Sequence, residues 1–295
     1  MDTFSQISQV IANVGILTFV VASMAALGLS LTIEQILAPL RNGRLVVIVL
    51  LANFVLTPAL AFAIKALIPM DEGYAIGLIL LATAAGAPFL PKLVQVAKGA
   101  IALSVGIMVL LMVTTVIYVP LVLPLLLPGV TVNPLDIAWS LVVLMLIPLA
   151  IGLFIKSRYG TVAESLQPPM SQISNMGLML GFVAVLALSW RSLLSTIGSG
   201  AILATALLII GAFLIGWFLA GKERIVRPVL GLGTGQRNVA AALVVAGSNF
   251  SDPNVLVICM VGAILMLISL MITAGELGKR APVDKDRDNH PIILE

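Results

Sequence analysis

The sequence predicts an all-α integral membrane protein whose spanning helices form an inverted repeat. Of its 295 residues, 60% are hydrophobic and 10% are charged, with a mean hydropathy of +1.17, so the charges are too few to cover a soluble core of this size. The apolar runs approach or exceed the roughly 20 residues of a spanning helix, which excludes a β-barrel with short alternating strands. Two runs also carry helix-breaking residues together with a cation.

About nine apolar runs are expected to cross the bilayer, with ends uncertain by several residues. In chain order they cover about residues 8–30, 43–67, 73–97, 101–127, 137–155, 173–190, 200–220, 228–248 and 254–275. The first run has only Asp2 in its N-terminal flank and exceeds the apolar region of a signal peptide, so it is expected to be a span. Residues 1–280 are expected to form one transmembrane domain, and residues 281–295 a polar cytoplasmic tail.

The cations predict the orientation of these runs, because Lys and Arg accumulate in short cytoplasmic loops. Twelve of them fall on one side of the nine-span arrangement: Arg41, Arg44, Lys98, Lys156, Arg158, Lys222, Arg224, Arg227, Lys279, Arg280, Lys285 and Arg287. Lys65 and Arg191 fall on the other side, while Lys92 and Arg237 lie within spans. The N-terminus is therefore expected outside and the C-terminus in the cytoplasm. The charge of +3 is a topological feature, and no basic, aromatic-rich face suggests a nucleic-acid partner.

The third and eighth runs are predicted to be broken helices, at residues 84–92 and 231–238. Unwound backbone at membrane depth is tolerated only where protein buries it or where it lines a cavity. The two runs are five spans apart, so equivalent helices would cross the bilayer in opposite directions. Transporters of this design bind substrate near the midplane, where the broken helices meet.

Several short motifs give the chain a family resemblance. Residues 233–238, Gly-Thr-Gly-Gln-Arg-Asn, resemble the Glu-Thr-Gly-x-Gln-Asn motif of the bile acid:sodium symporter family, and residues 96–105 and 53–58 resemble its sequences after the first broken helix and in the second span. The resemblance implies core helices at about 43–127 and 200–275, and panel helices at about 8–30 and 137–190. Substrate would bind between the two groups.

The chain differs from this family where the resemblance implies sodium ligands. The family's ligand glutamate is Gly233 here, its ligand glutamine is Arg237, and a Ser-Asn pair and a threonine are replaced by Leu90-Pro91 and Met108. Ser104 and Asn53 are the side chains left there to offer oxygen. All thirteen acidic residues lie in predicted loops, flanks or tails. A hard cation needs several oxygen ligands, so sodium binding at the family positions is doubtful, although backbone carbonyls could still hold an ion weakly. No other cofactor and no metal site is predicted.

The two intramembrane cations suggest a hypothesis about coupling. An arginine at the bilayer centre is costly and must be compensated by carbonyls at half-helix ends, by water or by an anionic substrate. Arg237 would replace one sodium ion and Lys92 the other, giving a sodium-independent carrier of a small organic anion. Lys92 could instead extend toward the cytoplasmic surface, or lose its proton and couple transport to protons.

The predicted site comprises a crossing region and a set of residual family ion-site positions. The crossing region, which would bind substrate or brace the broken helices, contains Pro88, Pro91, Lys92, Gln95, Thr234, Gln236, Arg237 and Asn238. The residual ion-site positions are Asn53, Ser104 and Gly233. Asn53, Gln95 and Ser104 could equally be interhelical hydrogen-bond formers.

Other functions fit the sequence less well. A sodium symporter with a rebuilt ion site, or an uncoupled facilitator or channel, stays open. An intramembrane enzyme is disfavoured, because no Asp, Glu or His is predicted within the membrane. A sensor or scaffold would not need two broken, cation-bearing helices. A plasma or bacterial inner membrane is the default expectation, and the sequence leaves the substrate, the oligomeric state and a bacterial or organellar origin open.

Overall fold

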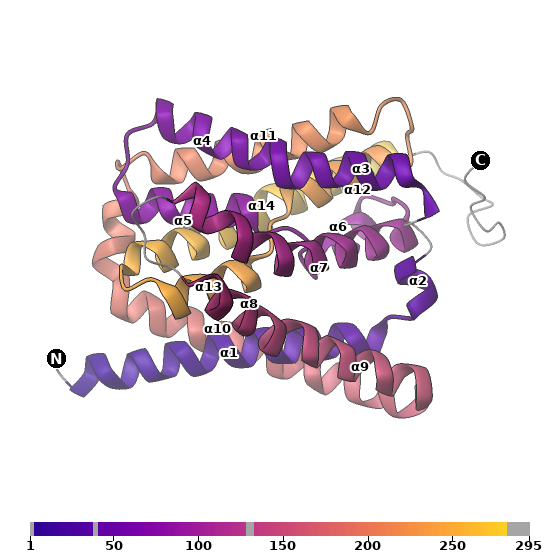
Figure 1. Cartoon of the computed structure of the whole chain (residues 1–295), viewed down its shortest axis with the longest axis horizontal. Helices are drawn as coiled ribbons and strands as arrows, with labels where there is room; N and C mark the ends of the chain where they lie inside the picture. The colour runs from indigo at the N-terminus through magenta and orange to yellow at the C-terminus, as the bar shows by residue number, and fades with distance from the viewer. Residues whose placement is uncertain (1–2, 38–40, 128–132, 282–295) are drawn as a thin grey trace.

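The computed structural model describes residues 3–37, 41–127 and 133–281, without the side chains of residues 3–9, 182 and 185–195. All regular secondary structure of the described residues is helical, as predicted, and they contain no strand. The predicted tail lies outside the described residues apart from Ala281. Its helices are α1 (Thr3–Ser30), α2 (Ile33–Leu37), α3 (Gly43–Leu51), α4 (Thr57–Leu67), α5 (Glu72–Thr83), α6 (Leu90–Val96), α7 (Ile101–Leu126), α8 (Pro134–Leu141), α9 (Ile147–Arg158), α10 (Gly160–Thr196), α11 (Ala201–Leu219), α12 (Val226–Gly235), α13 (Val239–Asn249) and α14 (Pro253–Arg280) (Figure 1).

Seven segments of the described chain are long and apolar enough to cross a membrane, which makes this a multi-pass integral membrane protein. One of these segments joins α3 to α4 through a π-helical turn, Ala52–Leu56, and another joins α8 to α9 through a second one, Val142–Leu146. A proline follows each π-helical turn, Pro58 and Pro148. A proline has no N–H to donate to the carbonyl four residues before it, so the helix widens locally there.

Two further helices are interrupted where breaker residues predicted it. Residues 84–89 separate α5 from α6, and residues 236–238 separate α12 from α13. These helices occupy the centre of the molecule: all of α5 after Glu72 is buried, as are residues 229–235 of α12 and 240–246 of α13. The exposed large apolar side chains instead lie on the surrounding helices, including α1, α9, α10 and α11.

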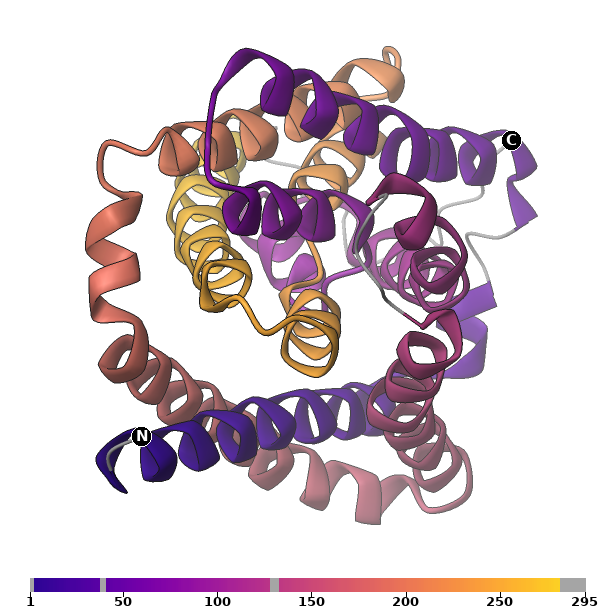
Figure 2. The ribbon, with the colours of Figure 1, turned by 60° about the vertical axis from the view of Figure 1, so that its left-hand side comes forward.

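Helices α1, α9 and α10 pack against one another and form a layer along one side of the remaining helices (Figure 2). Glycines allow this close approach, because a Cβ on Gly28 of α1 would collide with the backbone of Leu149 and Gly152 in α9. From the larger group, α13 contacts both α1 and α8, and α14 contacts α10. The two broken helices thus belong to the larger group, and one of them, through α13, meets the layer.

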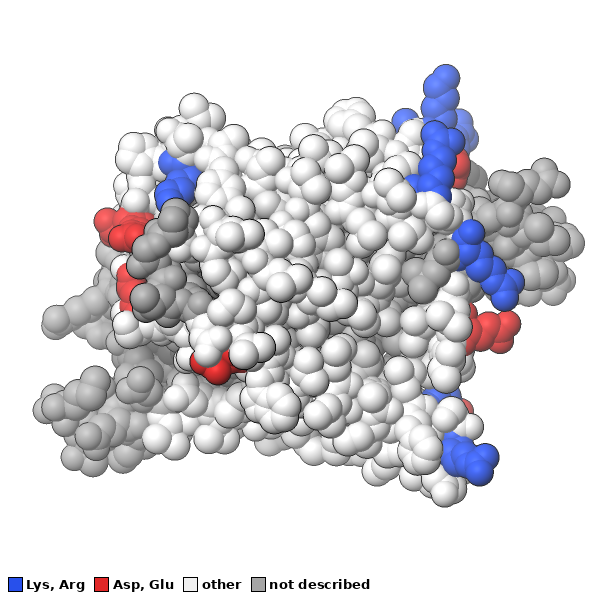
Figure 3. Space-filling view, in the orientation of Figure 1, with Lys and Arg blue, Asp and Glu red and all other residues white. Residues whose placement is uncertain are grey.

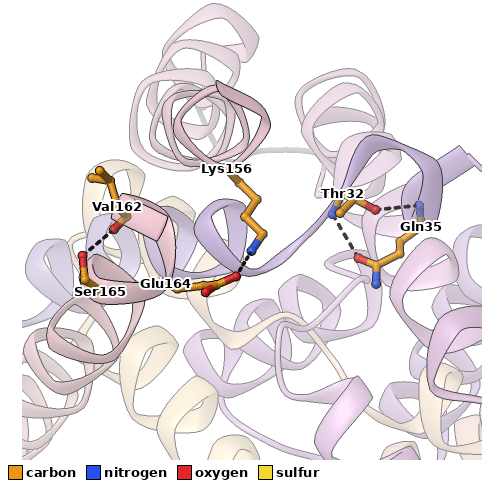
Figure 4. A network of polar contacts seen from close by, with 6 residues as sticks. All are labelled: Thr32, Gln35, Lys156, Val162, Glu164 and Ser165. Atoms are coloured by element: carbon orange, nitrogen blue, oxygen red, sulfur yellow. Dashed lines mark hydrogen bonds and ion pairs between the residues drawn. The ribbon is translucent and has the colours of Figure 1, made fainter. Parts of the chain in front are cut away.

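The charged side chains visible in Figure 3 lie toward the two ends of that face, and its middle is almost entirely uncharged. The turn between α9 and α10 carries an exposed ion pair, in which Lys156 Nζ lies 3.1 Å from Glu164 Oε1 (Figure 4). Nearby, at the start of α2, Thr32 and Gln35 exchange hydrogen bonds as a capping box (Figure 4). These contacts order the connections at the end of the molecule.

Candidate functional site

Arg237 is the only charged side chain that is buried in the described part of the chain. Its exposed fraction is 0%. The eight described acidic side chains are all exposed: Glu34, Asp71, Glu72, Asp136, Glu164, Glu223, Asp252 and Glu276. No described carboxylate therefore neutralises the guanidinium.

Hydrogen bonds to neutral oxygens hold the guanidinium instead. Nε donates to the carbonyl of Leu81 at 3.0 Å, and Nη2 donates to that of Ala82 at 2.7 Å. Nη1 donates both to Asn53 Oδ1 at 2.7 Å and to the carbonyl of Thr234 at 3.1 Å. These four bonds use four of the five guanidinium N–H groups. The side chain is thus fixed by the protein and not held ready for a carboxylate.

The carbonyls around the guanidinium come from the ends of two half-helices. Leu81 and Ala82 lie in the last turn of α5, and Thr234 in the last turn of α12. The last carbonyls of a helix have no intrahelical partner, and each helix C-terminus carries about half a negative charge. Two such ends together supply about one negative charge, comparable in size to the positive charge of one guanidinium. The broken helices themselves therefore compensate Arg237.

Asn53 reaches the site from the π-helical turn between α3 and α4. Its Nδ2 donates to the Val49 carbonyl at 3.0 Å and to Thr234 Oγ1 at 3.3 Å, which directs Oδ1 to Arg237. The turn has outside support, because Tyr118 Oη of α7 donates to the Phe54 carbonyl at 2.7 Å. Pro58 cannot donate to that carbonyl, so Tyr118 supplies the missing partner.

Asn238 joins the two breaks. Its backbone N–H donates to the Ala84 carbonyl at 2.9 Å and its Nδ2 to the Gly86 carbonyl at 2.9 Å, while Oδ1 accepts from the N–H of Ala241 and caps α13. Gly86 has a φ of +79°, and a Cβ there would collide with the backbone of Met112. Only glycine meets both conditions without strain. Asn238 is thereby a bracing residue of the crossing.

Thr115 of α7 braces the first break from the other side. Its hydroxyl accepts from the N–H of Ala85 at 2.9 Å and lies 3.0 Å from the carbonyl of the same residue, to which it donates. Together with Arg237 and Asn238, it provides partners for the carbonyls of residues 81, 82, 84, 85 and 86. Unwound backbone inside the membrane needs such partners, because no bulk water is there to supply them.

Apolar side chains fill the neighbouring position of the predicted ion site. A Cβ on Gly233 would lie 3.2 Å from Leu90 Cδ2 and 4.0 Å from Ile107 Cγ2. Leu90 and Met108, 1% and 0% exposed, belong to the same apolar core. Ser104 is buried and donates to the Ile101 carbonyl of its own helix at 2.6 Å. This position offers packing where oxygen ligands would be required.

The remaining predicted residues of the first broken helix lie apart from Arg237. Lys92 and Gln95 are exposed on α6, and Lys92 Nζ donates to Gln95 Oε1 at 3.1 Å. Pro88 is half-buried in the break, and Pro91 lies in the first turn of α6, where a missing N–H costs little. The expectation that Lys92 mirrors Arg237 is not met in position, because α6 begins at Leu90 and turns this side chain outward.

Three contributors to the site were not identified from the sequence: Thr115, Tyr118 and Met266, whose Sδ lies 3.1 Å from the backbone nitrogen of Arg237. Each lies in a long apolar helix, where a single Thr, Tyr or Met does not by itself indicate a functional site. The sequence gives one indication of the role of Tyr118. Pro58 has no N–H for the carbonyl of Phe54, four residues earlier, so that carbonyl needs a donor from elsewhere.

Comparison with known proteins places these observations in a family. Residues 17–196, more than half of the chain, match the sodium bile acid symporter family. The chain is 26% identical over 268 residues to the probable sodium/metabolite cotransporter BASS1 of Arabidopsis thaliana chloroplasts, covering 88% of this chain and 66% of that protein. It is 25% identical over 274 residues to the probable chloroplastic sodium/metabolite cotransporter BASS2 of Oryza sativa subsp. japonica, covering 90% and 64%. The chain thus spans just under two thirds of the length of these relatives.

Proposed function

We propose that this chain, which belongs to the sodium bile acid symporter family, carries a small organic anion across the membrane without sodium coupling. As a member of that family it is a membrane transporter and not an enzyme. The sodium independence, the anionic substrate and the mechanism are our proposal. The substrate would bind between the layer of α1, α9 and α10 and the larger helix group. Alternating access would expose that site first to one side of the membrane and then to the other.

The environment of Arg237 carries the proposal. The resemblance to the family motif aligns Arg237 with a glutamine that serves as a sodium ligand. At this position the guanidinium binds three carbonyls and one amide oxygen, the class of ligand that a hard cation also takes. A bound guanidinium and a sodium ion would compete for the same oxygens. Arg237 therefore serves as a permanent cation that holds the two half-helix ends together.

The second ion position supports the same reading in a different way. The family's ligand glutamate aligns with Gly233, and its Ser-Asn pair aligns with Leu90 and Pro91. The Leu90 side chain fills the space beside Gly233, so an ion would have no room there. The substitutions have also removed the side-chain oxygens that would bind it. Lys92 has no part in this replacement. In this proposal the guanidinium of Arg237 occupies one ion position, and the apolar side chain of Leu90 occupies the other.

The proposed topology retains nine crossings, with α5–α6 and α12–α13 as the broken members of an inverted repeat. It places the N-terminus outside and the C-terminus in the cytoplasm of a plasma or bacterial inner membrane, in accord with the distribution of Lys and Arg. α1, α8–α9 and α10 would be the panel, and the other crossing helices the core. The packing of α1, α9 and α10 supports that division.

Sodium-coupled transport is the second candidate, because both relatives are named sodium/metabolite cotransporters. Uptake of a panel of radiolabelled organic anions into proteoliposomes, with a sodium gradient, a proton gradient or neither, separates the two candidates. The proposal expects uptake without sodium in the wild type and its loss in Arg237→Gln. Strict sodium dependence in the wild type would refute the built-in cation and favour a rebuilt ion site.

A further inference from the structure

Gln236 carries an unpaired buried oxygen in the centre of the crossing. The residue lies between α12 and α13 and is 8% exposed, and its Oε1 accepts no hydrogen bond. Among the buried side-chain nitrogens and oxygens of the described residues, this is the only atom without a partner. An unpaired buried acceptor costs about 1–3 kcal/mol, and native structures keep few of them without a reason.

The two residues that follow Gln236 differ from it in that their side chains are hydrogen-bonded. Arg237 and Asn238 have every side-chain nitrogen and oxygen engaged within the protein. Gln236 ends α12 with extended backbone angles, φ −81° and ψ 109°. Arg237 and Asn238 thus brace the crossing, and Gln236 leaves its acceptor free.

The charge around Gln236 limits which molecule could donate to this oxygen. The ends of α5 and α12 compensate Arg237, and no buried carboxylate occurs among the described residues to favour a further cation. The positive end of α13, an 11-residue helix, begins three residues further on at Val239. This helix end favours an anion, whose own carboxylate cannot donate a hydrogen bond. The donor must then be an O–H or N–H elsewhere on the same molecule.

We propose that Gln236 Oε1 accepts a hydrogen bond from a hydroxyl or amide N–H of the transported anion and so selects hydroxylated or amidated organic acids. This inference rests on the proposed anion transport and adds the class of substrate. A site that offers a buried acceptor discriminates against an analogue that lacks the donor, because the acceptor then stays unpaired. A water molecule bound to Gln236 would satisfy the oxygen without giving this selectivity.

The test is uptake of matched acids that differ by one donor into sodium-free proteoliposomes. Suitable radiolabelled pairs are lactate and propionate, 3-hydroxybutyrate and butyrate, and mandelate and phenylacetate. In the wild type we expect the hydroxylated member of a transported pair to be preferred roughly 5- to 160-fold, the range set by about 1–3 kcal/mol for one unpaired buried acceptor. Gln236→Met, which keeps the length but has no hydrogen-bonding group, should reduce the preference to within about twofold.

Gln172→Met is the matched control, because Gln172 is exposed on α10 and belongs to no part of the predicted site. It should keep the wild-type preference. The ratio within a pair does not depend on how much protein folds, and equal uptake by the wild type would refute the assignment even if Gln236→Met does not fold. Equal uptake within every pair by the wild type, or an unchanged ratio in Gln236→Met, would overturn the assignment and leave anion transport intact. Absence of uptake for all the acids would instead count against the proposed transport, and with it against this inference.

Discussion

Arg237→Gln is the most informative single change, because it removes the buried charge and keeps an amide that can still donate. Glutamine has two N–H groups, whereas the guanidinium makes four hydrogen bonds, so at least two acceptors among Leu81, Ala82, Asn53 and Thr234 lose their partner. At about 1–3 kcal/mol for each unpaired buried acceptor, the variant should lose about 2–6 kcal/mol of stability. With about 2–4 °C per kcal/mol, taken from domains of 150–250 residues, Tm falls by roughly 4–24 °C.

The same change should create a response to sodium that the wild type lacks. Without the guanidinium, the C-terminal ends of α5 and α12 leave about one negative charge uncompensated, lined by oxygens that suit a hard cation. Sodium at tenfold its dissociation constant would then restore about 1.4 kcal/mol. We expect sodium chloride, compared with choline chloride, to raise the Tm of Arg237→Gln and to leave that of the wild type unchanged.

Thermal unfolding of the detergent-purified protein in the two salts provides both measurements. Arg224→Gln is the control, because it makes the same chemical change at an exposed arginine, where surface substitutions cost within about 0.5 kcal/mol. A Tm for Arg237→Gln within 1 °C of the wild type would contradict the energetic role of the guanidinium bonds. An equal gain from sodium in the wild type would show that an ion site persists beside Arg237.

Three further predictions follow from the same geometry. Tyr118→Phe should cost about 1–3 kcal/mol in thermal unfolding, because the Phe54 carbonyl loses its donor and Pro58 cannot replace it; the exposed Tyr159→Phe should cost far less. Lys92→Gln should leave anion uptake within about twofold of the wild type, because the Lys92 side chain is exposed and bonded only to Gln95. Abolished uptake would show that Lys92 takes part in transport. Uptake of a monovalent anion should be opposed by an interior-negative potential, measured in proteoliposomes with a potassium diffusion potential; potential-independent uptake would contradict carriage of the anion alone.

The helices and both breaks could be predicted because their causes lie in local sequence. Hydropathy over about 20 residues determines which segments can span a bilayer. Gly86, with its positive φ, and Pro88 lie in the first break, and Gly235 is the last residue of α12 before the second. The all-helical membrane fold follows from these facts alone. The nine-crossing count and the inverted repeat stay predictions.

The site could be predicted only in part, because most partners of Arg237 have no sequence identity. Three of its four acceptors are backbone carbonyls, and any residue at the end of α5 or α12 would provide them. Asn53 was identified through the family resemblance and not through its spacing, since 184 positions separate it from Arg237. Lys92 was assigned to the crossing because it lies within the third predicted span, at a place comparable to that of Arg237 in the inverted repeat. A shift of less than one helical turn in where α6 begins decides whether such a side chain points inward or outward.

A built-in cation changes what can drive transport. A sodium ion that binds on one side and leaves on the other contributes its gradient to the cycle, whereas Arg237 returns to its starting position with the protein and contributes none. Whatever path the guanidinium takes, one complete cycle of the proposed mechanism would transfer only the charge of the anion. For a monovalent anion, a potential of 100 mV corresponds to about 2.3 kcal/mol. At equilibrium this would hold the anion about fiftyfold less concentrated on the negative side, since 1.4 kcal/mol is a factor of ten. If the potential is negative inside the cell, the carrier would therefore favour export of its substrate, a direction that follows from replacing a mobile ion by a fixed one.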